Sequence, residues 1–316
     1  MPTRFDHVLF LGFGGPGKPE DIEPFLQNVA AGRQIPPARL AEVKRHYELV
    51  GGFSPYNELT FACVNQIKES LMRSGLQVPV YLGMRNWRPY IADVISQISG
   101  QGLRRGLAVI LAPHRSSASC FRYKESIDQA IKNLGGLPLK YTYLEPWGNH
   151  PLFIRAQADL LETCLRALPY PLAKCEIIFS AHSIPERMNQ NCRECSYSGE
   201  YETTCSSIAS RIGITRWTCA YQSRSGLPQE PWLRPDVEEV LRGAQARQME
   251  AAVVVPVGFF CDYVEVLYDL DIDANRTAQK LGIHYARVPT AVKHPDFIRM
   301  FAESIREFRP VLNPAV

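Results

Sequence analysis

The stretch "CEIIFSAH", residues 175–182, is an apolar run that ends in polar residues. Seven further runs of this kind occur along the chain, at residues 7–13, 79–84, 106–113, 139–147, 216–223, 251–260 and 284–289. Short, nearly continuous apolar runs are typical of parallel strands buried on both faces of a sheet. Helical patterns separate most of them, and this alternation predicts an α/β protein.

The predicted strands form two sets of four along the chain. We therefore expect two similar doubly wound, Rossmann-like halves with parallel sheets, joined by a helix near residues 150–168 and by "LPYPLAK". The expected division is residues 1–168 together with 295–316 against residues 169–294, with the last helix packing back on the first half. In such folds functional residues lie at the carboxyl ends of the strands and between the halves.

The composition is that of an ordinary globular protein, with 46% hydrophobic and 21% charged residues. A net charge of +3 and the absence of a Lys/Arg-rich run argue against a nucleic-acid partner. The longest apolar stretch, residues 251–260, is about half the length of a membrane span. The first residues carry too short an apolar run for a secretory signal. We expect a cytoplasmic protein without a transmembrane segment, and loose contact with a membrane surface stays open.

Several polar residues follow the predicted strands of the second half. His182 ends one strand, where it either binds backbone groups or, as a neutral imidazole, accepts protons near pH 7. Asp262, Glu265 and Asp269 are spaced i, i+3, i+7, which places them on one face of a helix. Asp262 and Glu265 also fit a capping box. A row of carboxylates that share protons would serve as a proton relay or cation path, and a cap and a relay are compatible.

Nine cysteines without a secretory context predict free thiols and not disulfides. Three of them, Cys192, Cys195 and Cys205, lie within one polar loop and the helix start that follows. A Cys-x-x-Cys pair is typical of zinc sites, iron–sulfur clusters and redox pairs. We expect a metal centre, with Cys219 or Cys261 as the candidate fourth ligand.

The chain resembles the ferrochelatase family, and so a chelatase-like fold, in several segments that occur in the family's order. They are "GFGGPGKPEDIEPFL", "YELVGGFSPYNELT", "LAPHRSSAS", "FSAHSIPE", "AYQSRSGLPQEPWLRPDVEEVL" and "VPVGFFCDYVEVLYDLD". The resemblance runs from about residue 7 to about residue 300. It implies a lyase of haem biosynthesis that inserts ferrous iron into a porphyrin, protoporphyrin IX or coproporphyrin III, and releases two protons.

The resemblance also implies roles for single residues. His182 corresponds to the family's motif histidine, the base or metal-handling residue, and Glu265 to its partner carboxylate. Asp262 and Asp269 match the acidic helix face. Trp232 matches an aromatic residue that packs on the macrocycle. The other positions that line the pocket or meet propionates are Phe13, Ser54, Arg85 and Ser117.

Some positions depart from the family pattern. Tyr263, in Cys261-Asp262-Tyr263, stands where the family commonly has a second histidine. Phe13 replaces a tyrosine of the coproporphyrin-type enzymes, and Ala30 and Ala31 replace basic residues. The substrate therefore stays open, with coproporphyrin slightly favoured.

Some ferrochelatases carry a [2Fe–2S] cluster, so the resemblance favours this cluster over zinc at Cys192, Cys195 and Cys205. The implied partners are the porphyrin and ferrous iron, with enzymes of the haem pathway as candidate protein partners. Two alternatives remain. One is a chelatase for another metal or tetrapyrrole, and the other is a non-catalytic sensor that binds haem or iron.

Overall fold

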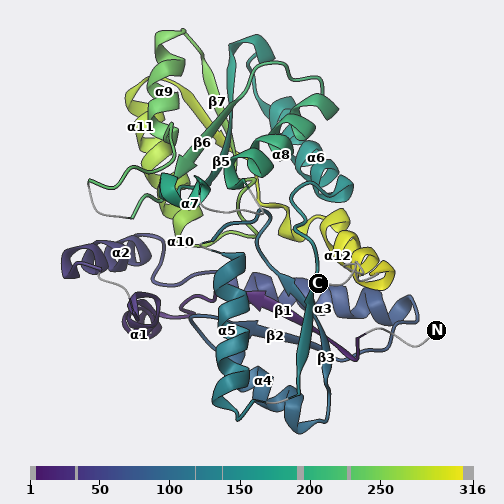
Figure 1. The fold of residues 1–316 in the computed structure, drawn as a ribbon. Coiled ribbons are helices and arrows are strands. Elements are labelled where there is room, and N and C mark those ends of the chain that lie inside the picture. Colours follow the sequence, from purple (N-terminus) through teal and green to yellow (C-terminus); the bar gives the residue numbers. More distant parts are fainter. Residues whose placement is uncertain are drawn as a thin grey trace.

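The computed structural model describes residues 5–32, 35–117, 119–136, 138–190, 196–225 and 229–308. The chain forms two four-stranded parallel sheets with helices on both faces (Figure 1). The strand order is β2-β1-β3-β4 in the first sheet and β6-β5-β7-β8 in the second. All eight predicted strands are therefore confirmed, and the two halves share one topology.

The first half contains the strands of the first sheet and five helices. Its strands are β1 (His7–Gly12), β2 (Val80–Met84), β3 (Arg105–Ile110) and β4 (Lys140–Tyr143), and its helices are α1 (Pro19–Ala30), α2 (Pro37–Leu49), α3 (Tyr56–Arg73), α4 (Ile91–Gly100) and α5 (Cys120–Asn133). Gly14 makes the turn after β1 at φ +86°, and a Cβ there would lie 2.9 Å from the Cβ of Trp87. The glycine-rich loop is therefore a tight turn whose backbone lies close to Trp87.

The second half is built around β5 (Cys175–His182). Its other strands are β6 (Thr218–Gln222), β7 (Ala251–Val255) and β8 (His284–Arg287), and its helical elements are α6 (Pro151–Ala167), η1 (Leu172–Lys174), α7 (Glu186–Gln190), α8 (Tyr197–Arg211), α9 (Val237–Ala246), α10 (Val264–Val266), the π-helix η2 (Leu267–Ala274), α11 (Asn275–Lys280), η3 (Ala291–Lys293) and α12 (Pro295–Glu307). Among the described residues, no helix is long and apolar enough to cross a membrane.

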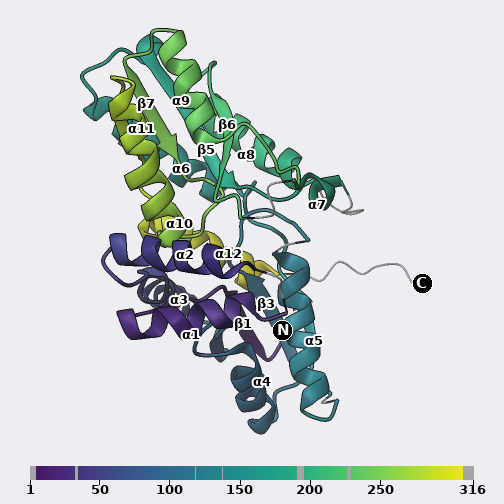
Figure 2. The same cartoon turned by 90° about the vertical axis from the view of Figure 1, so that its left-hand side faces the viewer.

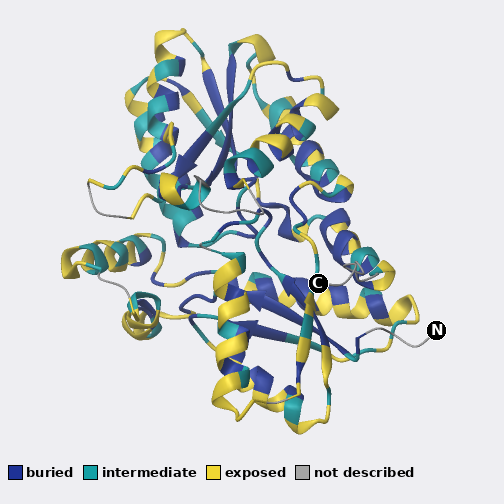
Figure 3. Cartoon of the chain, in the orientation of Figure 1, coloured by how far each residue is buried: buried dark blue, intermediate teal, exposed yellow. Residues whose placement is uncertain are grey.

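Burial follows the layers of the fold. Strands β1, β5 and β7 are almost entirely buried and the edge strands β4 and β8 are partly exposed, whereas the helices alternate buried inner and exposed outer faces (Figure 3). One apolar cluster contains strand residues of both sheets, including Phe10 of β1 and Phe179 of β5. The two halves therefore share a continuous core.

Helix α12 joins the two halves. It packs against α3 of the first half and against α6, and both views place it between the sheets (Figures 1 and 2). Helix α6 in turn packs against α8 and β7 of the second half. The last helix contacts both α3 and α6, so its assignment to the first half stays a prediction. The division at residue 168 also stays a prediction, because α6 precedes it and contacts the second half.

Phe297 of α12 is the aromatic residue on which this junction depends. Its ring is fully buried and lies 5.2 Å from the Trp147 ring and 5.8 Å from the Phe260 ring, between centroids. We expect Phe297→Ala to lower the free energy of unfolding by about 3–5 kcal/mol, because a cavity would remain. Chemical denaturation measures the change. The control is Phe121→Ala, whose ring is 59% exposed, with an expected change within about 0.5 kcal/mol. Equal losses in both variants would contradict the assignment.

Candidate active site

The candidate site lies at the carboxyl ends of the second sheet. His182 ends β5, and its neighbour in the parallel register is Gln222, which ends β6. The chain that leaves β7 continues to Glu265 in α10, and the Gln222 side chain donates a hydrogen bond to the Glu265 carbonyl oxygen at 2.7 Å. In Figure 1 β5 and β6 run toward the first half, with α10 beside α2. The sheet therefore brings His182 and Glu265 together, as expected from strand ends.

His182 and Glu265 form a hydrogen-bonded ion pair. The distance from Nε2 of His182 to Oε2 of Glu265 is 3.5 Å, and about a third of each side chain remains exposed. Nδ1 of His182 donates to the carbonyl oxygen of Ser183, which leaves Nε2 directed at the carboxylate. The hydroxyl of Tyr263 donates to the same Oε2 atom. Tyr263, which stands where the family commonly has a second histidine, thus binds the Glu265 carboxylate.

The pair holds one proton tightly. Burial by itself lowers the pKa of His182, but the charge of Glu265 and their hydrogen bond raise it to about 9. Burial raises the pKa of Glu265, but His182 more than offsets this and lowers it below its ordinary value. Near neutral pH the resting state is therefore imidazolium and carboxylate. The neutral imidazole expected of a base stays a prediction, and it requires that this proton first leave the pair.

Asp269 lies next to this pair in the π-helix η2. Ser223, which follows β6 at a positive φ of 62°, donates its hydroxyl proton to Oδ2 of Asp269. A left-handed backbone at a serine is strained and is often found at functional sites. Burial raises the pKa of Asp269 to about 7, with a further contribution from the Glu265 charge. Asp269 is therefore a group that gains and loses a proton near neutral pH.

The acidic segment differs from the single α-helical face that we expected. Asp262 precedes the helix, and Tyr263 is the N-cap residue without a side-chain capping bond. The predicted capping box is therefore wrong. Asp262 instead pairs with Arg287 (Oδ1 to Nη1, 3.2 Å), which also binds Asp271 through two nitrogens. The Asp262 carboxylate thus already has a partner, and the catalytic role of Asp262 stays a prediction.

Most of the predicted porphyrin-contacting residues lie in the loops that follow strands, whereas Ser54 lies between α2 and α3. Phe13 follows β1 and lies edge-on to Phe25, at 6.2 Å between centroids. The Ser54 hydroxyl accepts the backbone N–H of Tyr56 at 3.3 Å. Two of the predicted porphyrin-contacting residues have a buried polar atom without a hydrogen-bond partner among the described residues. These atoms are Oγ of Ser117 and Nε1 of Trp232. Trp232 is largely buried, and its contact with a macrocycle stays a prediction, as do the pocket roles of the others.

Arg85 follows β2, on the same edge of the first sheet. Its charge lowers the otherwise raised pKa of Tyr123, so the two side chains are close. Sequence reasoning missed α2 as a part of the site. The His46 ring stacks on Tyr268 of η2, with 3.5 Å between centroids, and Arg39 helps to lower the pKa of Glu265. The basic residues of α2 and the acidic residues of η2 are visible in the sequence and would suit a contact between the two helices. The sequence does not show that these helices meet.

The cysteines divide into separate places. Cys192 and Cys195 lie outside the described residues. Burial, followed by a hydrogen bond with Cys219, raises the pKa of the fully buried Cys205 thiol well above its usual value. Cys261 lies near Cys63 of the first half. Of the two candidate fourth ligands, only Cys219 therefore contacts Cys205. Within the described residues, no three His, Cys, Asp or Glu side chains gather as a metal site.

Cys120 is a thiol that sequence reasoning overlooked. It begins α5 and is partly exposed. The thiol lies close enough to Arg115 to help raise its pKa. Arg115 in turn pairs with Glu200 in the first turn of α8, with 2.6 Å between Nε and Oε1. Cys120 therefore lies on the side of the molecule where α8 begins.

Solved structures with the same fold are chelatases. CbiX, described as the terminal enzyme for siroheme biosynthesis in denitrifying bacteria, aligns with a TM-score of 0.57 and 16% identity over 96% of this chain and all of its own. SirB from Bacillus subtilis, with Fe³⁺, aligns with a TM-score of 0.58 and 13% identity over 95% and 94% of the two chains. At such low identity the likeness concerns the fold alone, and it places the chain in the chelatase fold class.

Sequence comparisons define the family within that class. The ferrochelatase family model matches residues 6–308. A ferrochelatase of Rhodopirellula baltica is 37% identical over 98% of this chain and 88% of its own length. A coproporphyrin III ferrochelatase of Mycolicibacterium vanbaalenii is 37% identical over 97% and 91%, respectively. The chain belongs to the ferrochelatase family.

The His182 proton gives a test of the site's electrostatics. Its pKa, read from a ring NMR titration, should be about 9 in the wild type. Glu265→Gln should lower that value by about 1–3, because burial remains while the counter-charge is lost. Glu202→Gln, an exposed change on α8, should leave it unaltered.

The folded pKa of His182 lies above its unfolded value of roughly 6.5. The His182 imidazolium therefore contributes stability that is fully present below about pH 6.5, as long as Glu265 is ionised, and is lost as the pH rises through about 9. A wild-type value near 6.5, or no response to Glu265→Gln, would exclude the ion pair.

Proposed function

We propose that the protein is a porphyrin metal chelatase, a lyase that inserts ferrous iron into a porphyrin in haem biosynthesis and releases two protons. The carrying observation is the ion pair of His182 and Glu265 at the carboxyl ends of the second sheet, in a chain of the ferrochelatase family. A cytoplasmic setting is part of the proposal.

In the proposed mechanism His182 and Glu265 receive the substrate iron. A metal ion binds the neutral imidazole and the carboxylate, so the proton held by the pair has to leave when the ferrous ion arrives. Nε2 of His182 and Oε2 of Glu265 then supply two ligands, and the porphyrin nitrogens replace them as the ion passes into the ring.

The same residues then remove the two pyrrole protons. As the ion leaves His182 and Glu265 for the ring, the two pyrrole N–H protons leave their nitrogens, and the freed imidazole and carboxylate accept one proton each. Asp269, with a pKa of about 7, takes protons from the pair and releases them outward. Asp273, whose charge acts on Asp269, continues this carboxylate path toward the surface.

We propose coproporphyrin III as the porphyrin. Relatives at 36–37% identity carry this name, and the substrate has four propionates where protoporphyrin IX has two. A cationic group for these carboxylates is present in α2, where Arg39 lies close enough to Glu265 to help lower its pKa. His46 of the same helix can donate a hydrogen bond as a neutral imidazole, because burial and the charge of Arg39 lower its pKa.

Anaerobic incubation with ferrous iron and each porphyrin tests the proposal. The absorbance of the metalloporphyrin should show turnover, with a higher kcat/KM for coproporphyrin III. A preference for protoporphyrin IX would refute the substrate choice. Faster insertion of cobalt or nickel would favour another chelatase, and stoichiometric binding without turnover would favour a sensor.

Single variants test the assigned roles. His182→Ala should reduce turnover by about 10²–10⁴-fold, the typical cost of losing a general base, with porphyrin binding retained. Glu265→Gln should slow turnover more than Asp262→Asn, because Asp262 is bound to Arg287. If Asp262→Asn is the slower enzyme and its fold is intact, the roles are reversed.

We further propose a [2Fe–2S] cluster on Cys192 and Cys195. Two places compete for the other ligands. Cys205 and Cys219 are already in contact, but burial opposes the thiolate form of Cys205 that a metal requires. Cys120 is partly exposed beside the residue that binds the start of α8. The cluster has no role in the chemistry proposed above and would act through stability.

Metal analysis tests the cluster. Protein made under iron-replete conditions should be reddish-brown, with about two irons and two sulfides per chain as the cluster formula requires. Cys192→Ser should lose the colour and fold poorly. Among Cys120→Ser, Cys205→Ser and Cys219→Ser, those that lose iron identify the remaining ligands, and Cys261→Ser should retain it. Colourless, fully active protein with zinc or no metal would contradict the cluster.

A further inference from the structure

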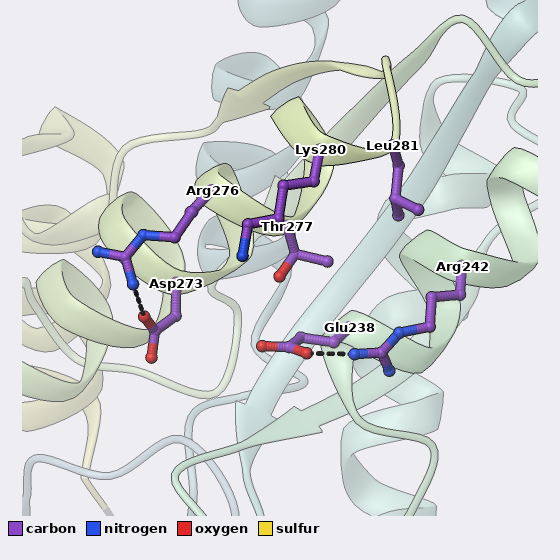
Figure 4. Close-up of a pocket in the computed structure, with 7 residues that line it drawn as sticks. All are labelled: Glu238, Arg242, Asp273, Arg276, Thr277, Lys280 and Leu281. Carbon is purple, nitrogen blue, oxygen red and sulfur yellow. Dashed lines mark hydrogen bonds and ion pairs between the residues drawn. The ribbon is translucent and has the colours of Figure 1, made fainter.

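A pocket of about 340 Å³ lies on the outer side of the second half, where α9 and α11 pack together. It is lined by Glu238, Arg242, Asp273, Arg276, Thr277, Lys280 and Leu281. In Figure 4 the ammonium of Lys280, the hydroxyl of Thr277 and the carboxylate of Glu238 point into the same space. Neither His182 nor Glu265 lines this pocket, so it is distinct from the site described above.

The lining carries three cations and two carboxylates. Arg242 pairs with Glu238 at 2.6 Å and Arg276 with Asp273 at 3.3 Å, whereas no carboxylate of the described residues pairs with Lys280. A guanidinium has five N–H donors, so each arginine retains donors beside its partner. The pocket therefore offers an unpaired ammonium, spare guanidinium donors and a hydroxyl, a donor set that suits an anion with several carboxylate oxygens.

Asp273 connects this pocket to the proposed chemistry. Its charge helps to raise the pKa of Asp269, which in turn interacts with Glu265 and His182. The pocket is thus the outer end of the row of carboxylates that begins at the catalytic pair. An anion that competes for Arg276 would release the Asp273 carboxylate, which is an oxygen ligand suited to divalent cations.

We infer that this pocket binds a small polycarboxylate anion and that ferrous iron arrives there as its chelate. The inference rests on the proposed chelatase function and adds to it the form in which the metal is supplied. Lys280 and Thr277 hold the anion, Arg276 exchanges Asp273 for it, and Asp273 receives the iron as the chelate opens.

Calorimetric titration of citrate into the iron-free, porphyrin-free protein tests the binding alone. Lys280→Glu should weaken citrate binding by about tenfold or more, and Lys280→Gln and Thr277→Val by less, since each removes one donor. The matched control is Lys132→Glu, an exposed lysine on α5 of the other half, which should bind citrate as the wild type does. Circular dichroism checks that each variant is folded.

Turnover provides the second reading. With a hydrated ferrous salt Lys280→Glu should match the wild type, whereas with ferrous citrate its KM for iron should rise about tenfold. Absence of citrate binding at millimolar concentration, equal binding by Lys280→Glu, or equally tight binding of inorganic phosphate would overturn the inference. A failure of the proposed function would appear separately, as no metalloporphyrin from either iron source in a protein that still binds citrate.

Discussion

The contact between His182 and Glu265 depends on the order of strands in the second sheet. Because β5 lies between β6 and β7, the residues that end these strands are neighbours although the chain separates them by dozens of positions. Parallel strands require crossover helices, which cover both faces of the sheet and leave the carboxyl ends as the place where polar side chains can meet. Because both side chains are partly buried at this edge, the charge of each one shifts the pKa of the other.

This dependence explains why the fold was predictable from the sequence. Buried parallel strands must be apolar throughout, so β5 and β7 appear as continuous apolar runs. The first polar residue after such a run marks the strand end, which is how His182 and the segment before Glu265 were recognised. The same reasoning pointed to the segment after β7 that contains Asp269.

Other features could not be read from the chain because they depend on distances in space. The partner of Asp262 is Arg287, which is 25 positions away on another strand. Residues 267–274 form a π-helix, in which backbone hydrogen bonds join residues five positions apart. The pattern of side chains along the chain does not distinguish this helix from an α-helix. The protonation of His182 follows from a separation of 3.5 Å that no spacing in the sequence specifies. These are also the features that set the chemistry of the site.

The pKa values impose an order of events on metal insertion. A proton that moves from His182, at about 9, to Asp269, at about 7, moves uphill in free energy by about 3 kcal/mol. A unit charge about 4 Å from the imidazolium contributes roughly 4 kcal/mol of repulsion at the effective dielectric of a protein surface. A ferrous ion carries two such charges, so its approach exceeds the cost and drives the proton outward. In the proposed mechanism the metal therefore deprotonates His182, and the pair stays protonated until iron arrives.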